Sequence, residues 1–151
     1  MCIRDSHGFP QGVEADREQQ FIGSDWGKYQ GDPRRYKWDV WAGRSASGLS
    51  IREHWGGSSG GPVLNDLGQL VGVNVGGNPR RGTTLSISVR ELAEFLNQNS
   101  IRFSYSGESG FSERIKEESY SRYGKQLRDE GVVSLVACNR TSRKIGALGL
   151  F

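Results

Sequence analysis

Cysteine, methionine and histidine are scarce in this chain, which has 2, 1 and 2 of them among its 151 residues. Two cysteines, Cys2 and Cys138, allow at most one disulfide, which excludes a disulfide-rich scaffold. We do not expect that disulfide, because Cys2 lies in a segment whose origin is doubtful. Residues 1–6 resemble a translated adapter sequence, and we set them aside as a non-native leader; a natural N-terminus is the alternative.

Long apolar runs are also lacking, so we expect no membrane span. Residues 1–6 have no apolar core, and the sequence therefore shows no secretory signal. The net charge is only +3, and acidic and basic residues alternate along the chain. No large field of one sign results, so we expect no nucleic-acid partner. A basic and aromatic stretch at 34–38 is the one candidate contact for nucleic acid.

Glycine is abundant instead, with 22 residues against an apolar fraction of 34%. This balance favours a loop-rich β domain over a helical bundle. Residues 36–40 alternate apolar and polar, residues 20–22 and 49–51 suggest short strands, and 83–87 suggests another. Residues 62–64 and 69–75 flank an Asn-Asp-Leu-Gly turn and predict a hairpin. Short strands at this spacing predict a barrel or a sandwich.

A helix should follow the last strand. Ser88 and Glu91 form a capping-box pattern, the apolar side chains of Val89, Leu92, Ala93 and Leu96 fall on one face, and Asn97–Asn99 closes the helix. Residues 104–110 read as a linker. A weakly amphipathic helix is predicted within 112–130, stopped by Gly131, and a strand within 132–138. An ordered appendage and a disordered tail are equal alternatives for this part of the chain, and we assign no function to residues 104–151.

The most informative motif is Gly-Gly-Ser-Ser-Gly-Gly-Pro at residues 56–62, which feeds directly into the predicted hairpin. It resembles the nucleophile loop of the chymotrypsin-like (trypsin-like) serine endopeptidases. The turn at residues 8–12 also resembles one early in the second barrel of the bacterial members. The resemblance covers residues 7–103 and implies a mainly β fold, the second six-stranded barrel of a double barrel with a C-terminal helix, in a chain truncated at its N-terminus.

The resemblance implies that Ser59 is the nucleophile of peptide-bond hydrolysis, through an acyl-enzyme, with the backbone N–H groups of Gly57 and Ser59 as the oxyanion hole. It also implies that Val75, Gly76 and Gly77 bind an extended peptide by strand addition. Substrate contacts for Glu53 and His54 follow from their place just before the nucleophile. A flexible linker and an anion-binding nest are the alternative interpretations of the glycine-rich run.

The family also needs a histidine and an aspartate upstream of the serine. His7 lies at the edge of the matching segment and His54 inside the serine's own loop, so neither is well placed as the base. Asp25, Asp32 and Asp39 are candidates for the carboxylate that orients such a base, but we interpret them as solvent-exposed turn acids. We therefore expect the triad's missing members, and the first barrel as main packing partner, outside this chain.

As given, the chain should be inactive on its own. No cofactor and no metal are expected. The alternative function is a catalytically inactive, protease-like module that binds peptides. The resemblance favours a secreted or periplasmic setting, which the residues themselves do not indicate.

Overall fold

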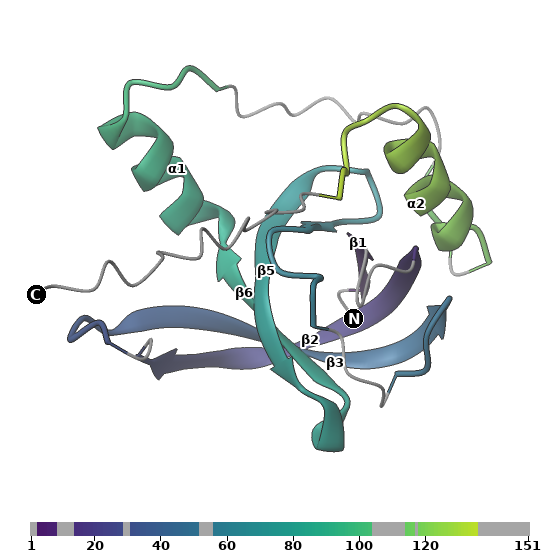
Figure 1. Ribbon diagram of the computed structural model, residues 1–151, viewed down its shortest axis with the longest axis horizontal. Coiled ribbons are helices and arrows are strands. Elements are labelled where there is room, and N and C mark those ends of the chain that lie inside the picture. Colours follow the sequence, from purple (N-terminus) through teal and green to yellow (C-terminus); the bar gives the residue numbers. More distant parts are fainter. Residues whose placement is uncertain are drawn as a thin grey trace, which may run out of the picture.

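The computed structural model describes residues 3–8, 14–28, 31–51, 56–103, 114–116 and 118–135. Six strands form a closed antiparallel barrel in the order β1-β2-β3-β6-β5-β4 (Figure 1). The strands are β1 (Ile3–Gly8), β2 (Ala15–Gly27), β3 (Tyr36–Ser47), β4 (Pro62–Leu64), β5 (Leu70–Asn78) and β6 (Thr83–Ser88). The predicted mainly β fold is thereby confirmed, including the six strands.

The β4–β5 hairpin forms where the sequence predicted it. The Asn65 side chain accepts hydrogen bonds from the backbone N–H groups of Leu67 and Gln69, which closes the turn. Gly68 completes it with a positive φ of 73°, a conformation that glycine adopts without steric cost. The turn residues therefore fix the register of the strand that leaves the Ser59 loop.

The barrel interior contains hydrogen-bonded polar side chains beside its aromatic residues. Trp41 is buried, and its Nε1–H donates to the Ser86 hydroxyl at 2.7 Å. Thr84 and Gln19 are also buried, and the Thr84 hydroxyl donates to the Gln19 side-chain oxygen at 2.6 Å. Burial lowers the pKa of Arg17 to about 10, since desolvation disfavours the charged guanidinium.

Helix α1 (Val89–Gln98) follows β6 as predicted, with the Ser88 hydroxyl accepting from the Glu91 N–H. The predicted second helix is also present, as α2 (Tyr120–Asp129). It contacts β1 and β2, whereas α1 contacts β5 and β6, so the two helices lie on different walls of the barrel (Figure 1). A short 3-10 turn (Pro79–Arg81) links β5 to β6.

Three expected features differ in the structure. Residues 3–6, which we set aside from the fold, belong to β1 and pair with β2. Residues 49–51 form a bend and a turn, not a strand, because Gly48 turns the chain at a φ of 84° and the Ile51 carbonyl accepts from the Arg17 side chain. Residues 132–135 form no strand, because Val133 donates back to the Leu127 carbonyl.

The aromatic residues of β3 are mostly covered. Trp38 and Trp41 are buried and Tyr36 is half-buried, while Trp55 lies outside the described residues. Large exposed apolar side chains occur on β2 instead, at Phe21, Ile22 and Trp26. The core role that is the default for tryptophan therefore applies to Trp38 and Trp41.

Candidate functional site

The Ser59 loop, residues 56–62, makes a tight turn between residue 51 and β4. Gly57 and Gly60 have φ values of 95° and 88°, which disfavour any residue with a Cβ. A Cβ on Gly61 would overlap the carbonyl oxygen of His7. The glycines are therefore required by the turn itself and by its close approach to β1, which a flexible linker would not need.

Strand β5 holds this loop from the other side. Gly60 N–H donates to the Asn74 carbonyl at 2.8 Å, and Asn74 N–H donates to the Gly61 carbonyl at 2.9 Å. The Ser59 hydroxyl donates to the Val75 carbonyl at 3.3 Å. Ser58 is buried whereas Ser59 is exposed. Of the two adjacent serines, Ser59 is thus the one that is accessible from outside the protein.

The far half of β5 carries the three residues expected to bind a peptide. Strand β4 pairs with β5 only from Leu70 to Val73, and the Ser59 loop extends these contacts to Val75. Beyond Val75, no strand in the described ranges pairs with this edge, while the other edge pairs with β6. A Cβ on Gly76 would meet no atom within 4 Å. Among the described residues this edge of β5 is therefore unpaired beyond Val75, and the face of the sheet at Gly76 is uncovered.

Two hollows adjoin these residues. One, of about 380 Å³, lies between the Ser59 loop and residues 131–135. The other, of about 530 Å³, is lined by Val75 and Gly77 together with parts of β2, β3 and β6. Both hollows are thus lined by residues that the sequence predicted to contact a substrate.

The two expected oxyanion donors remain available. In the described part of the chain, the N–H groups of Gly57 and Ser59 have no protein acceptor, whereas those of Gly60 and Gly61 are bonded within the fold. Unbonded backbone donors in a glycine turn suit an anion or a developing oxyanion. The other two substrate candidates, Glu53 and His54, lie outside the described residues.

None of the acids named as candidate partners of a base contacts a histidine here. Asp25 accepts from the Trp26 N–H, Asp39 accepts from Ser24, and Asp32 binds Arg34. His7 is buried, and its Nδ1 lies 2.8 Å from the Asp16 carboxylate. The described residues thus place no histidine in hydrogen-bond contact with Ser59 Oγ. In the basic and aromatic stretch at 34–38, the candidate contact for nucleic acid, the Trp38 side chain is buried.

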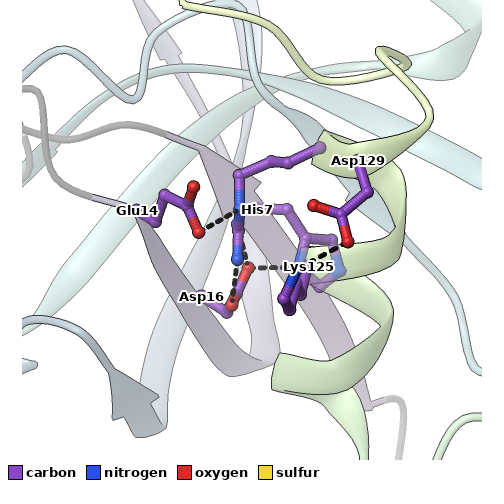
Figure 2. Close-up of polar contacts among 6 residues, drawn as sticks. His7, Glu14, Asp16, Lys125 and Asp129 are labelled. Carbon is purple, nitrogen blue, oxygen red and sulfur yellow. Dashed lines mark hydrogen bonds and ion pairs between the residues drawn. The ribbon is translucent and has the colours of Figure 1, made fainter.

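A buried ionic cluster lies under α2 and was not expected from the sequence. Figure 2 shows Asp16 next to His7 beside α2. Arg128 binds both Asp16 oxygens, at 2.7 and 3.0 Å, and its Nε lies 3.3 Å from Glu14. Lys125 pairs with Asp129 on the exposed side of the helix. The link between Asp16 and Arg128 spans 112 residues, and no local motif marks such a pair.

Hydrogen bonds determine the charge state of this cluster. Burial by itself raises the pKa of Asp16, but the hydrogen bonds from His7 and Arg128 outweigh it and hold the pKa below its usual value. The bond to Asp16 also raises the pKa of Arg128. His7 Nε2 has no hydrogen-bond partner among the described residues. The cluster therefore contains an ionised carboxylate that links β2 to α2.

Among the residues that the structure describes, no group of three or more histidine, cysteine or acidic side chains could hold a metal ion. No helix there is long and apolar enough to span a membrane. Comparison of the chain with protein-family models, with curated proteins and with solved structures found no match in any of the three.

Proposed function

We propose that this chain is the C-terminal barrel of a serine endopeptidase of the chymotrypsin-like family, with Ser59 as nucleophile. The observation that carries the proposal is the contact between Ser59 Oγ and the Val75 carbonyl. It sets the candidate nucleophile directly beside a strand edge that is open beyond Val75. A peptide bound to that edge by strand addition would run past the serine.

Two further features support the same chemistry. The N–H groups of Gly57 and Ser59 are available to stabilise an oxyanion, a contribution of two to three orders of magnitude in rate per donor in serine proteases. A closed six-stranded barrel followed by a C-terminal helix also agrees with the fold that the resemblance implies.

In this proposal Ser59 attacks the peptide carbonyl carbon while a histidine accepts the hydroxyl proton. The same histidine then protonates the leaving amine, and water hydrolyses the acyl-enzyme. His7 is committed to the ion cluster under α2. We therefore assign the base and its aspartate to a first barrel that precedes this segment.

Covalent labelling tests the nucleophile. The chain is expressed with the coding sequence that precedes it and treated with a fluorophosphonate, and the modified peptide is identified by mass spectrometry. Labelling of Ser59 is expected, with loss in Ser59→Ala and retention in Ser24→Ala, an exposed serine of the β2–β3 hairpin. Labelling of another serine, or of none, would contradict the assignment.

A peptide-binding module without catalysis is the second candidate. It is favoured by one observation, namely that the described residues supply no base to Ser59. Binding of peptides by the longer protein without fluorophosphonate labelling would select it.

A further inference from the structure

The segment that follows α2 turns back toward the Ser59 loop. Gly131 ends the helix with a φ of 72°, and its N–H donates to the Arg128 carbonyl. Val133 N–H donates to the Leu127 carbonyl at 3.0 Å. These bonds fold residues 131–135 against the end of the helix (Figure 1).

Val133 fastens this segment to the barrel. Its side chain is buried in a cluster with Leu127 of α2 and Leu64 of β4. Leu64 lies two residues beyond Pro62, the last residue of the Ser59 loop. The same short strand therefore positions both the loop and the segment that faces it.

The segment and the loop are the two sides of the hollow of about 380 Å³. Residues 131–135 line it without filling it. Val132 and Leu135 are 66% and 55% exposed beside it, although both are apolar. Covering exposed apolar side chains at the edge of a hollow with a ligand lowers the free energy, because apolar surface is removed from water.

We propose that residues 131–135 form a second wall of the peptide groove and bind an apolar side chain of the peptide. This inference rests on the proposed function, since it extends the groove beside Ser59. The wall lies across the hollow from the Ser59 loop and adds a specificity determinant supplied by the segment after the barrel. Arg128 is a positioning residue, because its bonds to Asp16 fix α2 and hence the wall.

Peptide binding by the chain itself tests the wall. The probes are two fluorescein-labelled extended peptides of alternating Ser and Thr, one with a central Leu and one with a central Asn, and the readout is fluorescence anisotropy. We expect Leu135→Ser and Val132→Ser each to weaken binding of the Leu peptide about fivefold, through loss of buried apolar area. Binding of the Asn peptide should not change.

Phe95→Ser is the matched control, because Phe95 is an equally exposed apolar residue on α1. Its binding constants should equal those of the parent chain. Arg128→Gln should reduce the preference for the Leu peptide, and Arg128→Lys should restore most of it.

A groove variant separates this inference from the proposed function. Gly76→Leu fills the open space beside β5 and should weaken binding of both peptides. If Gly76→Leu acts but the variants at 132 and 135 do not, the wall is wrong and the groove stands. If Gly76→Leu has no effect, strand addition at β5 is wrong. Tighter binding after Leu135→Ser would also overturn the wall, because the segment would then be a cover.

Discussion

Ser59 Oγ lies 3.3 Å from the Val75 carbonyl oxygen, which joins a glycine-rich turn to the last residue of β5 before its unpaired edge begins. The contact brings the proposed nucleophile and the proposed peptide-binding edge together across 16 residues of sequence. The hairpin between them creates this relationship, because it pairs Pro62 with Val73 and so aligns the loop with the end of β5.

Gly61→Ala should destabilise the protein by about 2 kcal/mol, because its Cβ would overlap the His7 carbonyl oxygen. Urea denaturation gives the free energy of unfolding. Gly76→Ala is the matched control, since its Cβ would enter open space. Equal stability of the two variants would show that the loop does not approach β1 as closely as described.

Gly124→Ala should destabilise the protein, although replacing glycine by alanine in a helix usually stabilises it. In an exposed helix, replacing glycine by alanine stabilises by about 1 kcal/mol. Here the new Cβ would overlap the Asp16 carboxylate and lie 2.5 Å from His7 Nδ1. We expect net destabilisation and faster amide exchange in α2, while Gln126→Ala, at an exposed position of the same helix, leaves exchange unchanged. Slower exchange in Gly124→Ala would mean that α2 does not pack on this pair.

Asp16→Asn should lower stability near neutral pH by about 3 kcal/mol, because it removes the buried carboxylate that binds the Arg128 guanidinium. The lowered pKa of Asp16 sets the pH dependence. A carboxyl whose folded pKa is depressed contributes stability above its unfolded pKa of about 3.9, and this contribution is lost as the pH falls through the folded value.

The stability difference between parent and Asp16→Asn should therefore narrow below about pH 4. Denaturation curves of both proteins across this range measure it. His7, Glu14 and Arg128 face the carboxylate and are present in both proteins. A difference that stays constant into strong acid would show that Asp16 is not held ionised by these contacts.

The sequence predicted the parts of the fold that local chemistry determines. The Asn65 turn, the Ser88 cap and the Gly131 stop each depend on a residue with a specific backbone or hydrogen-bonding role. Strands β2 and β3 are longer than the alternation of apolar and polar residues indicated. β2 carries Arg17, Glu18 and Gln19 as fully buried residues, and a charged run gives no strand-core signal.

The site was predictable in part for the same reason. Ser59 and the β5 edge are separated by one hairpin, so their approach follows from the motif and its turn. The proposed wall at 131–135 and the observed Asp16–Arg128 pair depend on packing between distant segments, which no spacing in the sequence encodes. The expected strand at 132–138 failed, in its described part, because Val133 is bound to the end of α2.

Peptide cleavage tests the central claim most directly. The chain, expressed with the coding sequence that precedes it, is incubated with fluorescein-labelled casein, and release of labelled fragments is followed over time. We predict hydrolysis that Ser59→Ala reduces by at least about a thousandfold and that Ser24→Ala leaves unchanged. Hydrolysis that persists in Ser59→Ala, or no hydrolysis by the longer protein, would contradict the assignment of Ser59 as the nucleophile of a working endopeptidase.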